Sequence, residues 1–146
     1  MSTMRWQIGI AALAAALSFS GCVRTPPEQR LRDTVAALQA AIEARDVGGM
    51  KEILAEDFVG TDGLDREGTG RLAQVMFLRH RDVGVSLGPL EVELHERHAT
   101  VRFNAALTGG SGAPLPDTAR LYDVETGWRL EGNQWRLTSA SWTPRL

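Results

Sequence analysis

The sequence predicts an α+β domain, in which a group of helices precedes an antiparallel sheet. Two patterns support this prediction. From residue 28 to residue 80, apolar side chains recur three and four positions apart, which is the spacing of amphipathic helices. After Asp82 they alternate with polar ones, as they do in half-buried strands. The chain has 146 residues and shows no internal repeat, which fits a single folded domain.

Composition excludes several classes of function. The formal net charge is −2, so no basic excess is available to bind the phosphates of a nucleic acid. The single cysteine, Cys22, can form neither an internal disulfide nor a cysteine-rich zinc site.

The first 21 residues have the pattern of an export signal. Arg5 provides a positive charge, and residues 8–17 form an uncharged apolar run that ends in the small, polar segment SFSG. This run is shorter than the roughly 20 residues of a membrane-spanning helix. We therefore interpret the segment as a cleavable signal rather than as a membrane span or a buried helix.

The end of that segment resembles the lipobox of bacterial lipoproteins. The motif consists of Phe19, Ser20, Gly21 and Cys22, with phenylalanine where the family usually has leucine. The resemblance implies cleavage before Cys22, a diacylglyceryl group on its thiol and usually an acyl group, such as palmitate, on its new N-terminus. Two or more acyl chains anchor a protein stably. The alternative, plain secretion, would leave a lone free thiol in an oxidising compartment.

The lipoprotein interpretation divides the chain into three parts. Residues 1–21 form the signal peptide, 22–27 a short polar membrane tether, and 28–146 the folded domain. Val23 occupies the position where aspartate often retains Gram-negative lipoproteins at the inner membrane. We therefore expect a location in the cell envelope, at the outer membrane and facing the periplasm.

Three helices are expected first. Residues 27–46 place Leu31, Val35, Leu38 and Ile42 on one face, with Pro27 in the first turn, where its missing N–H is tolerated. A short second helix covers about residues 47–54. Asp65 caps a third helix over roughly residues 66–80, whose apolar side is made of Leu72, Val75, Met76, Phe77 and Leu78.

The strands are expected to follow in a meander. A short strand near Phe58 precedes the third helix, and further strands cover residues 90–94, 99–107, 119–130 and 134–143. Residues 108–117 form a glycine- and proline-rich loop, and the segment containing Gly132 and Asn133 makes a tight turn.

This order of elements resembles the nuclear transport factor 2-like superfamily, which includes SnoaL-like proteins and steroid delta-isomerases. The resemblance is carried by residues 55–58, 99–107 and 128–142. It implies a cone-shaped, cystatin-like roll, in which three helices pack on a curved antiparallel sheet around an apolar cavity. The residues that could line this cavity, or alternatively fill an ordinary core, are Phe58, Phe77, Tyr122, Trp128 and Trp142.

Catalysis of the steroid-isomerase type needs a carboxylate base and an oxyanion donor such as a tyrosine. Tyr122 is the single tyrosine, and the candidate carboxylates are Asp57, Asp62 and Asp123. We expect Asp57 to have a structural role at a helix end and Asp62 to make a turn, although Asp62 stays a candidate pocket residue. Tyr122 and Asp123 are neighbours on a strand and therefore face opposite sides.

The histidines and loops indicate no other chemistry. His80 complements the dipole at the end of the third helix, and His95 and His98 lie across a predicted turn, without further metal ligands. Neither a phosphate-binding loop nor a nucleophile elbow is present. We expect no metal and no cofactor.

The sequence thus predicts an envelope lipoprotein whose domain binds a small apolar ligand or a protein partner, and we favour a protein that is not an enzyme. The alternative is a SnoaL- or steroid-isomerase-like enzyme that transfers a proton on a carbonyl compound. A third possibility is an accessory subunit that forms a homodimer through its sheet. The partners expected are the membrane, through the lipid anchor, and no nucleic acid.

Overall fold

The computed structural model describes residues 24–110 and 118–145, and Cys22, the signal peptide and most of the predicted 108–117 loop lie outside these ranges. Three helices are present, α1 (Pro27–Glu43), α2 (Val47–Ile53) and α3 (Arg66–Arg79). The strands are β1 (Leu54–Val59), β2 (Asp82–Leu87), β3 (Glu91–Leu94), β4 (His98–Gly110), β5 (Thr118–Glu131) and β6 (Gln134–Pro144), with a short 3₁₀ turn at Thr61–Gly63.

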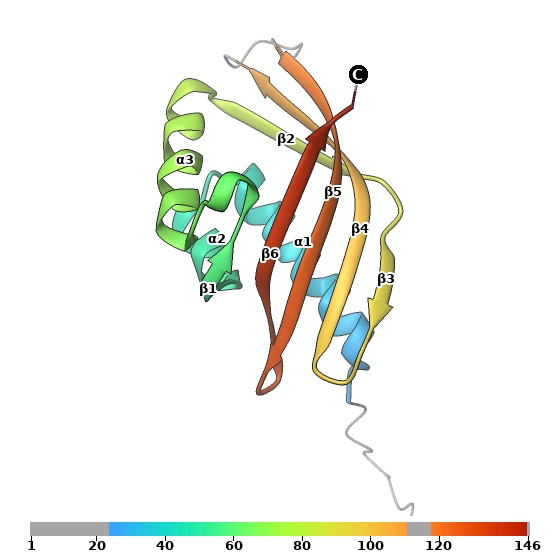
Figure 1. The fold of residues 1–146 in the computed structure, drawn as a ribbon. Coiled ribbons are helices and arrows are strands. Elements are labelled where there is room, and N and C mark those ends of the chain that lie inside the picture. Colours follow the sequence, from blue (N-terminus) through green and yellow to red (C-terminus); the bar gives the residue numbers. More distant parts are fainter. Residues whose placement is uncertain (1–23, 111–117, 146) are drawn as a thin grey trace, which may run out of the picture.

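The strands form one curved, mixed sheet in the order β1-β6-β5-β4-β2, and β3 also pairs with β4 (Figure 1). All neighbours are antiparallel except β1, which runs parallel to β6. The predicted α+β class is confirmed, with three helices packed against the sheet. In sequence, β1 is separated from the antiparallel strands by the 3₁₀ turn and α3.

The helices begin where the sequence provides caps. Pro27 occupies the first turn of α1, as its fixed φ angle favours. The carboxylates of Asp46 and Asp65 accept hydrogen bonds from Gly49 N (2.9 Å) and Gly68 N (2.6 Å), respectively. These bonds satisfy backbone donors that have no partner inside a helix, and they fix the starts of α2 and α3.

The edge of the sheet beyond β4 is formed by two consecutive strands, β2 and β3. Leu87 pairs with Ala105 and Glu91 with Arg102, so both strands continue along the same neighbour. The three residues between them, 88–90, face only two residues of β4, and they include Pro89. The edge is therefore bent at this point. Strand β2 was not predicted, although its valines and leucine alternate with smaller residues.

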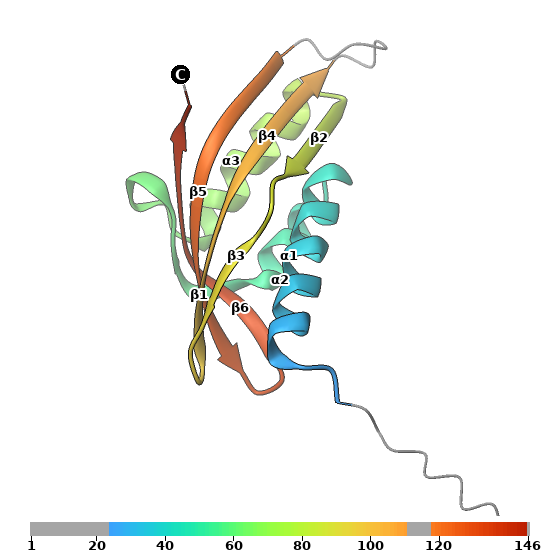
Figure 2. The same ribbon diagram turned by 90° about the vertical axis from the view of Figure 1, so that its right-hand side faces the viewer.

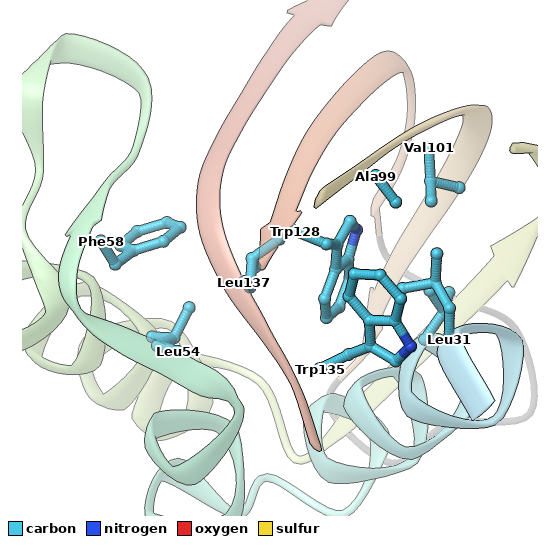
Figure 3. Close-up of a cluster of buried hydrophobic side chains, with 9 residues drawn as sticks. Leu31, Leu54, Phe58, Ala99, Val101, Trp128, Trp135 and Leu137 are labelled. Carbon is cyan, nitrogen blue, oxygen red and sulfur yellow. The ribbon is translucent and has the colours of Figure 1, made fainter. Parts of the chain in front are cut away.

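The core lies between α1 and the lower half of the sheet in Figure 1. Trp128 and Trp135 are 1% and 2% exposed and lie side by side against Leu31, which is fully buried (Figure 3). Thr126 links two polar groups inside this core. Its hydroxyl donates a hydrogen bond to Val101 O (2.9 Å) and accepts one from Trp128 Nε1 (2.9 Å). This core uses the predicted apolar stripe of α1.

Helix α3 has the predicted boundaries but not a buried face. Leu72, Val75 and Met76 are each between 41% and 45% exposed, and Leu78 is 82% exposed. The buried residues of α3 are instead Gly68 and Gly70. The helix packs through its first half on α2 and β1 and stands at the side of the sheet (Figure 1). We call these four exposed residues the α3 apolar stripe.

None of the described helices is long and apolar enough to cross a membrane.

Candidate functional site

The candidate pocket residues occupy two different environments. Phe58 and Trp128 are 2% and 1% exposed and belong to the central core cluster (Figure 3). Their side chains are therefore packing residues in this conformation and do not line an opening.

Tyr122 and Trp142 lie farther along the sheet, on the face that carries the core, which we call the inner face. Tyr122 pairs with the buried Ala105, and Trp142 pairs with Val124, two residues along β5 from Tyr122. Both aromatic side chains are half-buried, as is Phe77 on α3. Asp62 is exposed in the 3₁₀ turn, with a left-handed φ of 59°. Its position is consistent with a role in making the turn.

Tyr122 and Asp123 are on opposite sides of the sheet. Asp123 pairs with Asn104 and lies 3.4 Å from the guanidinium of Arg145, on the outer face. Alternation along a strand separates adjacent side chains in this way, and no register shift of the β4–β5 pair intervenes. These two residues therefore do not form a catalytic pair.

Asp57 is bound by an arginine from a distant strand. It lies within β1 rather than at a helix end, and it accepts two hydrogen bonds from Arg129 of β5, at 2.9 and 3.1 Å. The Arg129 guanidinium lowers the pKa of Asp57, and Asp57 in turn raises the pKa of Arg129. A carboxylate stabilised in its ionised form is a weak proton acceptor, which disfavours Asp57 as a general base.

The Asp57–Arg129 pair lies in a polar cleft of about 980 Å³ between α1, the α2–β1 segment and the paired ends of β5 and β6. Arg136 donates hydrogen bonds to Glu52 O and Gln134 Oε1 at one side of it. Sequence reasoning missed this cleft, because the residues of its ion pair are 72 positions apart. Its charged lining residues are Asp33, Glu52, Glu56, Asp57, Arg66, Arg129, Glu131 and Arg136.

A second cleft, of about 560 Å³, lies on the outer face of the sheet. It contains Arg102, whose Nε lies 2.7 Å from Glu125 and whose pKa is raised by that hydrogen bond. None of the six candidate pocket residues lines either of these two clefts. Charged residues line both clefts, whereas the predicted ligand cavity is apolar.

The histidines are spread over the molecule. His80 lies at the end of α3, with its ring against Gly109 of β4. His95 lies 3.5 Å from Glu93, and its backbone N–H donates to His98 O (2.8 Å) across the β3–β4 turn. Within residues 24–110 and 118–145, no group of three potential metal ligands comes together.

The remaining unusual surface is the α3 apolar stripe, whose four side chains are between 41% and 82% exposed. Exposed apolar residues gathered on one surface often mark a binding site. The ion pairs of the two clefts and the α3 apolar stripe thus lie on different parts of the domain.

The sequence matches no protein-family model and no curated protein. Several solved structures share its fold. A nuclear transport factor 2-like superfamily protein from Salmonella enterica is 11% identical, with a TM-score of 0.71 and coverage of 82% of this chain and 92% of that one. A Streptomyces avermitilis protein, whose name proposes a dehydratase of the same family, is 16% identical, with a TM-score of 0.72 and coverage of 83% and 99%.

A Bdellovibrio bacteriovorus protein is 14% identical, with a TM-score of 0.72, and the match covers 80% of this chain but only 41% of that one. At this level of identity, the similarity establishes the fold and leaves the chemistry open. The chain has the nuclear transport factor 2-like fold, as its sequence pattern implied.

Proposed function

We propose that this chain, a nuclear transport factor 2-like domain behind a lipobox, is an envelope lipoprotein that binds an apolar partner and does not catalyse a reaction. The α3 apolar stripe is the observation that carries the binding role, since its leucine, valine and methionine side chains are exposed. A protein surface or a small apolar molecule would remove these side chains from water, at a gain of roughly 25 cal/mol for each Å² buried.

The lipid anchor is supported by the sequence. Cys22 follows the apolar run and the small residues that lipoprotein processing requires. We propose that the mature protein is held in the outer membrane and faces the periplasm.

The absence of a catalytic role is supported by the placement of the candidate acids and bases. Asp57 is bound by Arg129, Asp123 lies on the face opposite Tyr122, and Asp62 is exposed in a turn. Proton transfer requires such groups to converge within hydrogen-bond distance of one substrate.

Native mass spectrometry of the purified mature domain tests the binding role. We expect a bound apolar molecule, or a partner recovered by crosslinking from the envelope, that is lost in Val75→Asp. The matched control is Ala36→Asp on the exposed side of α1. Equal retention in both variants would contradict a binding role for the stripe.

Acyl labelling in cells tests the anchor. Cys22→Ser should accumulate as unprocessed precursor without an acyl label, because serine lacks the thiol that accepts the diacylglyceryl group. Normal mass and normal membrane extraction of this variant would refute the lipoprotein assignment.

The alternative is an enzyme of the SnoaL or steroid-isomerase type that acts on a carbonyl compound. The dehydratase name of the Streptomyces avermitilis structure favours testing it. Tyr122→Phe and Asp62→Asn should leave every assayable activity unchanged if the domain only binds. A loss of turnover in either variant would favour the enzyme.

A further inference from the structure

One end of the domain is built from three segments that are distant in sequence, which we call the tether pole. They are the start of α1, the β3–β4 turn (residues 95–97) and the β5–β6 turn (residues 132–133), which lie together at the lower end in Figures 1 and 2. Trp135 Nε1 donates to Pro27 O (3.0 Å), and Arg30 Nη1 donates to Asn133 O (3.2 Å). Arg97 Nη2 donates to Leu130 O (3.0 Å), so hydrogen bonds join all three segments.

The chain leaves this pole toward Cys22 over a very short distance. Only residues 22–26 precede Pro27, and five residues span at most about 18 Å. The lipid headgroup layer on one side of a bilayer takes up about 6 Å of that length. An acylated Cys22 would therefore keep the pole within about 12 Å of the headgroup surface.

The tether fixes the position of the pole, whereas the direction of the domain's long axis depends on what the pole contacts. Strand β4 alone has 13 residues, which correspond to about 40 Å at the rise of a strand. Its far end, at Gly110, lies next to the start of β5 and away from α1's first turn (Figure 2).

The charges of the pole fit a phospholipid surface. Its acidic residues Glu28 and Glu131 are bound by arginines, at 2.8 and 3.3 Å. Among the described residues, no carboxylate forms an ion pair with Arg24, Arg30 or Arg97. Arg30 and Arg97 instead donate hydrogen bonds to backbone carbonyls. The described carboxylates near these three cations that also have no ion pair are Glu96 and Asp33, which accepts a hydrogen bond from Gln29 (2.9 Å) and lines the same cleft as Glu131.

We propose that the tether pole rests on anionic lipid headgroups in the anchored protein, so that the β4–β5 end points away from the membrane. This inference rests on the lipid anchor proposed above. Each arginine near an anionic surface contributes about fivefold to its association with the headgroups. The α3 apolar stripe then lies along the side of the domain, where a partner in the periplasm can reach it.

Paramagnetic relaxation tests this orientation without depending on acylation in the cell. The chain from Cys22 onward contains every described element and the single cysteine, whose thiol is coupled to a maleimide lipid. The lipid is placed in nanodiscs made of equal parts of phosphatidylcholine and phosphatidylglycerol, together with a gadolinium-chelate lipid. Amide signals of Arg97 and Gly132 should broaden several-fold more than those of Gly110 and Ala119. Equal broadening at the two ends, or stronger broadening at Gly110, would overturn the orientation.

Charge variants test the headgroup contact itself. The double variant Arg24→Gln, Arg97→Gln should lose most of the extra broadening that phosphatidylglycerol causes relative to pure phosphatidylcholine. The matched double variant Arg81→Gln, Arg120→Gln, at the other end, should keep it. Equal behaviour of the two double variants would refute the arginine contact. Failure of acyl labelling at Cys22 in cells, with the orientation retained in nanodiscs, would refute the anchor alone.

Discussion

Truncating matched leucines on α1 and α3 measures which helix face belongs to the core. Leu31 is fully buried against Trp128 and Trp135, so Leu31→Ala removes a side chain that is enclosed on all sides. Such substitutions cost about 3 kcal/mol through lost burial and the cavity left behind. Leu72 is 45% exposed, and Leu72→Ala should therefore cost about 1 kcal/mol.

Urea unfolding of the chain from Cys22 onward, followed by tryptophan fluorescence, gives both free energies of unfolding. Trp128 and Trp135 are buried, so their emission reports the loss of the core. In a separate thermal unfolding experiment, we expect the midpoint to fall by about 12 °C for Leu31→Ala and by about 4 °C for Leu72→Ala. Equal losses would show that α3 is packed in solution, and they would refute the interpretation of its stripe as a free binding surface.

Three further substitutions test individual contacts. Thr126→Val should cost about 2 kcal/mol in chemical unfolding, because it leaves the buried Trp128 N–H without an acceptor, and Thr126→Ser should restore most of this loss. Asp57→Asn should make the free energy of unfolding less dependent on pH in the acid range. The arginine partner lowers the pKa of Asp57, so the contribution of Asp57 to stability is present above pH 3.8 and is lost as the pH falls below that value. An identical pH dependence of the unfolding free energy in the variant and the unmodified protein would contradict this. Gly109→Ala should cost about 1 kcal/mol, since a Cβ there would lie 2.8 Å from His80 Nδ1, and the loss should disappear in a His80→Ala background if this contact causes it.

Local patterns predicted most of the secondary structure. The spacing of Leu31 and Val35 identified α1 and its buried face, and Asp65 marked the start of α3. The alternation around Val101 identified β4. Each of these signals lies within a few residues of the element that it defines.

The features that were missed depend on contacts between distant segments. An apolar stripe on α3 shows that the helix is amphipathic, but it cannot show whether another element covers it. The Asp57–Arg129 pair joins β1 to β5, and neither residue carries a local signal of its partner. The parallel pairing of β1 with β6 likewise depends on the path of the chain through α3 and the antiparallel strands. For the same reason, the sequence suggested which residue types could line a pocket, but it could not predict whether those residues lie together.

The bend at residues 88–90 has a consequence for contacts between copies of the chain. A straight edge strand offers an unbroken row of backbone donors and acceptors to the edge of another molecule. Here Pro89 interrupts that row between β2 and β3, and Gly88 already donates its N–H to Asn104 O at 2.8 Å. Under the lipid anchor proposed above, copies would be confined to two dimensions and would collide often. The interrupted edge would limit their polymerisation by strand addition under that crowding.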